Sequence, residues 1–363
     1  MINVGIVGVG NVAAMLVQSV EYYRSLGSSE GLIHEKIGKY EVAHIRFVYA
    51  VDVSREKVGR DLSEAIFAFP NSVRKFAPVA RGVTVRMGKV LDGVAPHMVE
   101  DFRPARAEEP TLSQLAREMQ DAGVEVLLNL LPVGSEEASR FYAAAAAQAG
   151  AALVNAIPVF IASKGFPSPA PVLGDDIKGQ LGATAVHRAL ASLVRWRGAR
   201  LLETYQLNVG GNTDFKNMLA WERLASKKES KTMAVASTQE RPEEVVREER
   251  VYAGPSGYVP FLGNTKVSHI YLKALAFAGS EVEVEVRLKV DDKAMASAVL
   301  VDAIRVAKVA MDHGLRGSLD WASAFYFKHP PRQARSEMEA LRMLYAGLER
   351  LGERAEPRLD EPF

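Results

Sequence analysis

The chain has 363 residues, of which 48% are hydrophobic and 25% charged, and its formal net charge is +1. This is the balance of a globular protein with room for two compact regions, and it offers no basic surface for nucleic acid or membranes. Cysteine is absent, which excludes disulfides, thiolate nucleophiles and cysteine-ligated zinc. With no leader before the first strand and no membrane-spanning apolar run, we expect a cytoplasmic protein. The scarcity of Asn and Gln beside abundant Arg, Glu and Ala is compatible with a thermophile.

The N-terminal half alternates expected strands and helices. Strands are expected at 2–7, 45–51, 124–131, 153–156 and 171–173, and helices at 14–23, 62–69, 111–122 and 136–149, with short strands and turns over 77–96. Because most of these strands are continuous apolar runs, they are typical of a parallel sheet covered by helices on both faces. The predicted fold class is α/β, with a Rossmann doubly wound parallel sheet.

The sequence pattern changes near residue 200. Residues 201–209 and 282–290 alternate apolar and polar side chains, which predicts half-exposed strands of an antiparallel or mixed sheet. Residues 225–250 are highly charged and are expected at the surface. Helical patterns return at 294–313 and 334–351.

A glycine-rich turn follows the first expected strand. Gly8-x-Gly10-x-x-Ala13 is the pattern that binds dinucleotides when it joins a strand to a helix. Gly8 would make the turn, Gly10 would let a pyrophosphate approach, and a small residue at 13 would let the helix pack closely. The helix N-terminus, at Asn11 and Val12, would supply N–H donors. The alternative is that these glycines are only turn residues.

Asp52 ends the second long strand, where an acid binds the ribose hydroxyls of NAD and repels the 2′-phosphate of NADP. It lies much further from the glycines than the roughly 20 residues that are usual. Residues 27–41 would therefore be an insertion.

Two later strand ends carry polar residues and prolines at the edge where such sheets bind ligands. The candidate cofactor-binding residues there are Asn129, Pro132, Asn155, Ala156 and Pro158. Ordinary loop chemistry explains them equally well.

Asp175 and Asp176 follow the expected strand 171–173 and could cap a helix or line the nicotinamide end of a cofactor site. Further on, the run from Gly210 to Asp214 could form an anion-binding nest of N–H groups.

The lysines are individually inconclusive. Lys227 and Lys231 would share one face of a helix, where like charges repel unless an anion lies between them. From this segment alone, a solvated charged surface is the more expected outcome. In isolation, the sequence gives no indication of a function for Lys266, Lys328 or Asp292.

In chain order, however, a set of stretches resembles the inositol-1-phosphate synthases, and the archaeal and actinobacterial members most closely. The resemblance extends over nearly the whole chain and rests on GVGNVA, AVDVSREKVGRDLSEAI, LDGVAPHM, NLLPVGSEEA, NAIPVFIAS, GDDIKGQLGAT, NVGGNTDFKNM, SKKESKT, LGNTKVSHIY and FKHPP. The last six stretches together are far more specific than the glycine pattern.

The resemblance implies an architecture and an activity. Residues 1–195 would form the NAD-binding domain, 196–293 an α/β catalytic and tetramerisation domain, and 294–363 a segment returning to the first. The activity would be cyclisation of D-glucose 6-phosphate to 1L-myo-inositol 1-phosphate, by oxidation at C5, enolisation, aldol closure and reduction at C5. The protein would be an isomerase that recycles its NAD, and a homotetramer. The product could enter phospholipid head groups or an osmolyte.

The resemblance also assigns site residues. The catalytic residues would be Lys227, Lys231, Lys266, Lys328, Asp176, Asp214 and Asp292. Asp176 and Asp292 would also contact the cofactor, and the substrate would be bound by Gly182, Thr184, Asn212, Lys231 and Lys266.

The chemistry is consistent with this set, because an enolate and a phosphate both need cations, and crowded lysines lower one another's pKa. Our hypothesis is that Lys227 and Lys328 serve the C5 oxygen and its proton. Lys231 and Lys266 would then hold the phosphate and stabilise the C1 oxygen.

Two positions depart from the family pattern. Asn264 stands where relatives often have an acid, and Asp292 is followed by Lys293 and Ala294 rather than by Ser-Pro-Asn. Archaeal and actinobacterial members tend to use a divalent cation, which carboxylates, phosphate and water would hold here, but no ligand set can be named.

Two other functions stay open. A simple NAD-dependent dehydrogenase of a sugar phosphate or semialdehyde would leave the dispersed lysines without a role. A non-catalytic NAD-binding sensor would show no turnover.

Overall fold

The computed structural model describes residues 1–357, apart from the side chain of Trp221. Seven strands form a parallel sheet in the order β12-β7-β6-β5-β1-β3-β4. These strands are β12 (Gly317–Ser318), β7 (Pro171–Leu173), β6 (Ala152–Asn155), β5 (Val126–Asn129), β1 (Ile2–Val7), β3 (Ile45–Asp52) and β4 (Val85–Met87). The strand order reverses at β1, as in dinucleotide-binding sheets. The predicted α/β doubly wound fold is confirmed.

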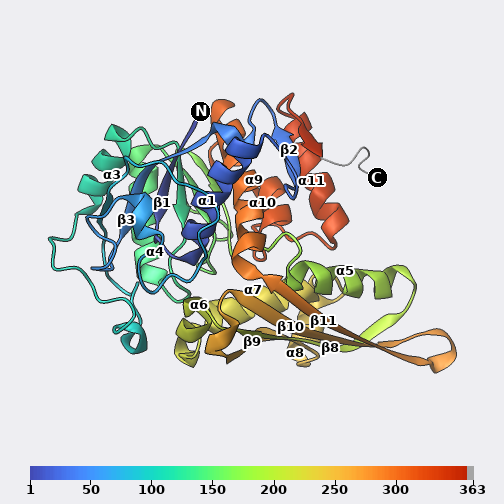
Figure 1. Ribbon diagram of the computed structural model, residues 1–363. Helices are drawn as coiled ribbons and strands as arrows, with labels where there is room; N and C mark the ends of the chain where they lie inside the picture. Colours follow the sequence, from blue (N-terminus) through green and yellow to red (C-terminus); the bar gives the residue numbers. More distant parts are fainter. Residues whose placement is uncertain (358–363) are drawn as a thin grey trace.

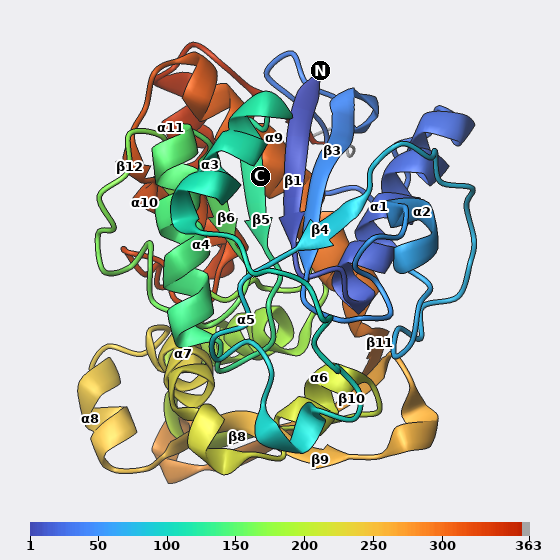
Figure 2. The same ribbon diagram turned by 90° about the vertical axis from the view of Figure 1, so that its left-hand side faces the viewer.

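Helices cover both faces of this sheet, which explains why its strands are apolar throughout. On one face lie α3 (Leu112–Asp121) and α4 (Glu136–Ala149), seen in front of β5 and β6 in Figure 2. On the other face lie α1 (Asn11–Leu26), α9 (Asp292–Asp312), α10 (Asp320–Tyr326) and α11 (Glu337–Glu349). Within β5, Val126 and Leu128 pack on the second face and Leu127 on the first.

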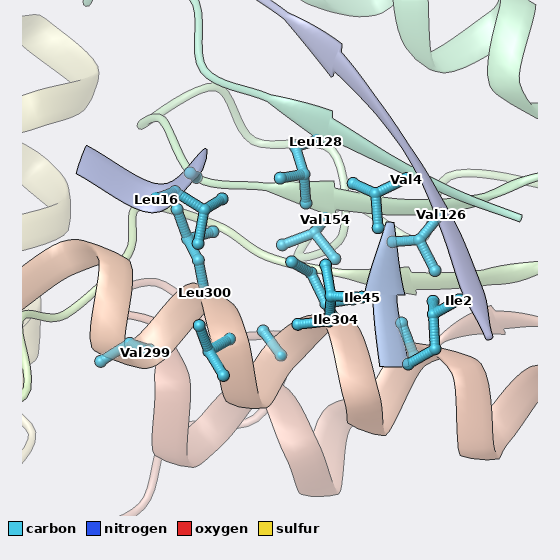
Figure 3. Close-up of a cluster of buried hydrophobic side chains, with 14 of the residues drawn as sticks. Ile2, Val4, Leu16, Ile45, Val126, Leu128, Val154, Val299, Leu300 and Ile304 are labelled. Carbon is cyan, nitrogen blue, oxygen red and sulfur yellow. The ribbon is translucent and has the colours of Figure 1, made fainter. Parts of the chain in front are cut away.

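The long helix α9 brings the C-terminal part of the chain back into the core of the first sheet. Leu300 and Ile304 are fully buried in the same apolar cluster as Val126 and Val154. Figure 3 shows Ile304 below these strand residues and Leu300 beside Leu16 of α1. The start of α9, at Asp292, is therefore held on a rigid base.

The second sheet has four strands in the order β11-β10-β8-β9. They are β8 (Arg200–Gly210), β9 (Val251–Tyr258), β10 (Thr265–Leu275) and β11 (Glu281–Asp291). β8 and β9 are parallel and the other neighbours antiparallel, so the sheet is mixed, in agreement with the alternating pattern. In Figure 1, α5 (Ala183–Trp196), α6 (Thr213–Asn217) and α7 (Ala225–Ala236) lie on the side of this sheet that faces the first domain.

Residues 27–41 separate the glycine turn from Asp52 because they contain an additional strand. β2 (His34–Ile37) pairs antiparallel with β13 (Ala355–Pro357) near the end of the described chain. The insertion thus joins the N-terminal domain to the C-terminal segment.

Two expected helices are shorter in the structure. α2 (Leu62–Ala65) does not reach residue 69. Pro70 has no N–H for the carbonyl of Ile66, which accepts a hydrogen bond from the Asn71 side chain instead. α11 begins at Glu337 rather than 334, because Ser336 caps it by accepting from the N–H of Glu339.

The remaining short elements connect these units. They are α8 (Pro242–Arg247) and the 3₁₀ turns Val42–His44, Pro96–Met98, Trp221–Arg223, Pro260–Leu262 and Phe277–Gly279. Across residues 1–357, no helix has both the length and the apolar character that a membrane span requires.

Replacing Ile304 by Ala tests whether α9 is part of the N-terminal core. The side chain is fully buried, so its truncation should lower the free energy of unfolding by about 2–5 kcal/mol in urea denaturation. Leu26→Ala, at a side chain that is 56% exposed, should change it by less than about 0.5 kcal/mol. Equal effects of the two changes would contradict this packing.

Candidate active site

A single cavity runs from the glycine turn after β1 to the start of α9. It lies at the carboxyl ends of β1, β3, β5 and β6 and is closed from the other side by α6 and α7. Most of the residues predicted from the sequence line it. They are Gly8, Gly10, Asn11, Val12, Asp52, Pro132, Ala156, Pro158, Asp176, Gly182, Thr184, Asp214, Lys227, Lys231, Lys266, Asp292 and Lys328.

The glycine turn has the geometry that its pattern predicts. Gly8 has φ +89°, and a Cβ there would lie 2.9 Å from the carbonyl oxygen of Leu130. Gly10 is the N-cap of α1 and brings no side chain to the cap, and its Cα faces open space. The first N–H groups of α1 therefore face the cavity without a competing side chain, which suits a pyrophosphate.

Asp52 fastens this turn to the end of β3. Its carboxylate accepts hydrogen bonds from the N–H of Val9 and from those of Val53 and Ser54, each at 2.8 Å. Lys57, which sequence reasoning missed, is fully buried beside it, with Nζ 3.8 Å from the Asp52 carboxylate. Contact of Asp52 with a ribose stays a prediction.

Asn129 and Asn155 do not line the cavity, contrary to expectation. Both are fully buried, and the Asn129 amide donates to Asn155, whose own amide donates to Asp175 at 2.7 Å. They are the last residues of β5 and β6, and their hydrogen bonds stabilise this edge of the sheet beneath the cavity wall. The residues after them, Pro132 and Ala156, form the wall.

The two adjacent aspartates have different roles. Asp175 is fully buried, and its carboxylate also accepts from the backbone N–H groups of residues 161, 162 and 163 at 3.0–3.1 Å. Asp176 points the other way, into the cavity, from a backbone with φ +60°. The sequence could not separate them, because both follow the same strand.

Asp176 is the centre of the lysine cluster. Its Oδ1 accepts from the Nζ atoms of Lys227 and Lys328, both at 2.9 Å, and its Oδ2 accepts from the Ser230 hydroxyl at 2.8 Å. Burial alone would raise the pKa of this carboxyl, but the two ammonium groups outweigh burial and hold it well below its usual range. Asp176 is therefore a permanent anion between two cations.

The expectation that residues 225–250 lie at the surface is wrong for the start of this segment. The helix α7 turns Ser230 and Lys231 inward, and Lys231 is 5% exposed. The charged pattern resembled a solvated helix because the opposing carboxylates, Asp176 and Asp292, come from distant parts of the chain. The i and i+4 lysines thus share a buried face.

The lysines differ in how firmly they hold their protons. Burial lowers the pKa of Lys328 to about 8, against the opposing effect of Asp176 and with help from Lys227. Burial and the neighbouring Lys227 and Lys266 lower the pKa of Lys231 well below its ordinary value. The pKa of Lys227 is raised, because Asp176 and Asp214 together outweigh its burial.

At the far end of the cavity, Lys266 pairs with Asp292 at 2.6 Å. Burial would raise the pKa of Asp292, but Lys266 and Lys293 hold it well below its usual range. Lys293 also lines the cavity and is 5% exposed, although the sequence showed it only as a departure from the family pattern. The sequence feature that could have pointed to Lys293 as a site residue is its position directly after Asp292, in the first turn of α9.

Two predicted or noted positions are not among the residues that line the cavity. The side chain of Asn212 caps α6 by accepting from the N–H groups of Asp214 and Phe215, so it does not itself line the cavity. Asn264 accepts through its backbone carbonyl from the N–H of Asp292 and is likewise absent from the lining.

A buried arginine holds α7 against the C-terminal segment. Arg188 of α5 donates to the Ser237 hydroxyl and the Ala234 carbonyl at the end of α7, to the Ala334 carbonyl, and to Glu337 at the start of α11. Because Lys227 lies on α7 and Lys328 precedes α11, this network supports the geometry around Asp176.

The lysine end of the cavity carries an excess of positive charge. Five lysines (227, 231, 266, 293 and 328) and three aspartates (176, 214 and 292) line it. Within residues 1–357, no group of three or more His, Asp or Glu side chains is arranged to hold a metal ion. Buried cations in excess of their carboxylates create a site for an anion.

A doubly wound sheet with an open glycine turn, joined through one cavity to a cluster of cations, defines a dinucleotide-binding α/β protein with an adjoining anion site. Comparisons with known proteins are specific. The chain is 45% identical to the inositol-3-phosphate synthase of Mycolicibacterium smegmatis, over 93% of this chain and 97% of the relative. It is also 45% identical to the inositol-3-phosphate synthase of Corynebacterium glutamicum, with the same coverage. The chain belongs to the inositol-1-phosphate synthase family.

Two further comparisons agree. The family model for myo-inositol-1-phosphate synthase matches residues 182–293. A myo-inositol-1-phosphate synthase-related protein from Thermotoga maritima superposes with a TM-score of 0.78 at 25% identity, covering 99% of this chain and 100% of that one. The inositol-3-phosphate synthase of Caenorhabditis elegans, at 15% identity and a TM-score of 0.76 over 96% of this chain and 84% of that one, shows the shared fold.

Asp175→Asn tests the structural role assigned to the first aspartate. An asparagine keeps one oxygen acceptor, but its NH₂ group replaces the other and faces the backbone N–H groups of residues 161–163, so at least one of them loses its acceptor. We expect the free energy of unfolding to fall by about 1–3 kcal/mol or more, measured in urea. Asp121→Asn, an exposed position at the end of α3, is the control, and an equally small effect at both positions would contradict the assignment.

Proposed function

We propose that this chain converts D-glucose 6-phosphate to 1L-myo-inositol 1-phosphate and recycles NAD in the process. The observation that carries the proposal is the single cavity in which the glycine turn of the first domain leads directly to a cluster with two more lysines than aspartates. One end suits a dinucleotide and the other a sugar phosphate. Membership of the family supports the same substrate and product.

The residues at the glycine turn fit NAD. Gly8 and Gly10 leave the first N–H groups of α1 open toward the cavity, and Asp52 lies at the end of β3 where the ribose would be. When bound, NAD supplies a hydride acceptor at C5 in the first step and returns the hydride in the last. Asp52 would favour NAD over NADP, because its carboxylate would repel a 2′-phosphate.

Lys328 and Lys227 are suited to different tasks around the C5 oxygen. With a pKa near 8, Lys328 has a neutral fraction that can accept the proton of the C5 hydroxyl as the hydride leaves. Lys227, whose pKa is raised, keeps its charge. It would stabilise the enolate oxygen that forms at C5 when a proton is lost from C6. Asp176 holds both ammonium groups at one point.

Lys231 and Lys266 are suited to the phosphate and the C1 oxygen. They line the same cavity as Gly182 and Thr184, which lie at the N-terminus of α5. A phosphate dianion would oppose the burial and the lysine neighbours that lower the pKa of Lys231, and would favour its charged form. Closure of C6 onto C1 places negative charge on the C1 oxygen, which these cations would stabilise.

Several finer properties stay predictions. A homotetramer and the use of the product in phospholipids rest on the family resemblance. A cytoplasmic location and a warm growth temperature rest on the sequence features described above. A simple dehydrogenase is not favoured, because it gives no role to the buried lysines.

The direct test combines glucose 6-phosphate and NAD and follows the product by phosphorus NMR and NADH by absorbance. We expect inositol 1-phosphate without net NADH. Lys227→Ala should lower turnover by about 100-fold, because the charge at the enolate oxygen is lost, whereas Lys164→Ala, at an exposed lysine outside the cavity, should leave it unchanged. Accumulation of NADH would instead indicate a dehydrogenase, and near-normal turnover of Lys227→Ala would overturn the role of Lys227.

The pH dependence of turnover tests the role of Lys328. Its pKa is lowered from the ordinary lysine value to about 8, and only the neutral amine can accept a proton. Turnover should therefore be low in acid, rise with pH through about 8, and level off above that value. A profile that is flat from about pH 6 to 9 would show that no base with this pKa takes part.

A further inference from the structure

Of the five lysines at the lysine end of the cavity, Lys293 is the one to which sequence and family resemblance gave no role. Its backbone is fixed at the first turn of α9, where the Asp291 side chain accepts from the N–H groups of Lys293 and Ala294. Its side chain is 5% exposed and lines the same cavity as the other lysines. Burying a lysine ammonium this deeply costs free energy unless opposite charges or a ligand interact with it.

The ammonium of Lys293 lies between two carboxylates from different elements. Its Nζ is 3.9 Å from Oδ2 of Asp214, on α6, and 3.9 Å from Oδ2 of Asp292, on α9. At this separation the charges attract, but the distance is too long for a hydrogen bond. The N–H donors of Lys293 are therefore available to a ligand in the cavity.

The two carboxylates would otherwise resemble a site for a divalent cation. Mg²⁺ is commonly held by one or two carboxylates together with substrate phosphate oxygens and water. Here the space between Asp214 and Asp292 is taken by an ammonium group of this chain, and Lys266 occupies the other oxygen of Asp292 at 2.6 Å. The residues present therefore do not fit a divalent cation between these two aspartates.

We propose that Lys293 is a built-in cation of the substrate site, which occupies the position of a divalent cation between Asp214 and Asp292 and donates to an oxygen of the sugar phosphate. This inference rests on the proposed function for the identity of the ligand. The part of the inference that concerns the cation does not depend on the proposed function. Whether a metal ion can bind between the two carboxylates is a property of the protein alone.

The first experiment measures metal binding without any turnover. Mn²⁺ is titrated into the NAD-bound protein and free Mn²⁺ is followed by electron paramagnetic resonance. We expect Lys293→Met to bind one Mn²⁺ at least about tenfold more tightly than the wild type, because a repelling charge has been removed from between two carboxylates. Adding Asp214→Asn to Lys293→Met should abolish the gain.

The second experiment measures the affinity for glucose 6-phosphate by calorimetry in the absence of divalent cations. Lys293→Met should weaken binding by about 10- to 100-fold, as expected for loss of a hydrogen bond to a charged group, and Lys293→Arg should restore part of it. The matched control is Lys308→Met. Lys308 lies on the same helix, is 12% exposed, and pairs with Glu125 and Asp312 outside the cavity. Its replacement should leave substrate affinity unchanged.

The outcomes separate the two proposals. Mn²⁺ binding that is equal in the wild type and Lys293→Met would overturn the role of Lys293, whatever the enzyme catalyses. Unchanged affinity of Lys293→Met for glucose 6-phosphate would overturn its contact with the substrate. Failure of the wild type to make inositol phosphate would contradict the proposed function, while the Mn²⁺ titration would still decide whether Lys293 takes the place of a cation.

Discussion

The carboxylate of Asp176, held between the ammonium groups of Lys227 and Lys328, is the interaction on which the rest of the site depends. A buried charge costs several kcal/mol unless it is paired, and here one anion pairs with two cations at 2.9 Å each. The three residues come from a strand end of the first domain, from α7 and from the C-terminal segment. Their meeting point therefore fixes the relative positions of three parts of the chain, and the lysines around it outnumber the aspartates, which favours an anionic ligand.

The fold makes this meeting point possible by returning to its first sheet after building the second. The helix α9 starts beside the cavity, at Asp292, and then crosses the core of the N-terminal domain, where Ile304 packs on the strands. Asn11 of the glycine turn also reaches Thr213 of α6, at 3.4 Å. Because both sheets contribute to one cavity wall, the dinucleotide and the sugar phosphate can be held face to face.

Local patterns predicted local structure well. The strand, turn and helix around Gly8 follow from periodicity and backbone freedom, and the mixed second sheet follows from its alternating strands. Contacts between distant parts of the chain could not be predicted in the same way. The i and i+4 spacing of Lys227 and Lys231 carries no information on which carboxylates lie opposite. The sequence therefore predicted a solvent-exposed helix. Asn129 and Asn155 have the composition of a ligand-binding loop but brace the sheet from behind. The family resemblance, rather than any single motif, grouped the lysines, and it gave no role to Lys293.

The most direct measurement is the turnover of Asp176→Asn, which keeps the shape of the side chain and removes the charge that Lys227 and Lys328 share. With the fold verified by circular dichroism and thermal melting, we expect inositol 1-phosphate formation to fall by about 100-fold or more, because both lysines lose their common anchor. Turnover close to that of the wild type would show that the lysines are positioned without Asp176 and would contradict its central role.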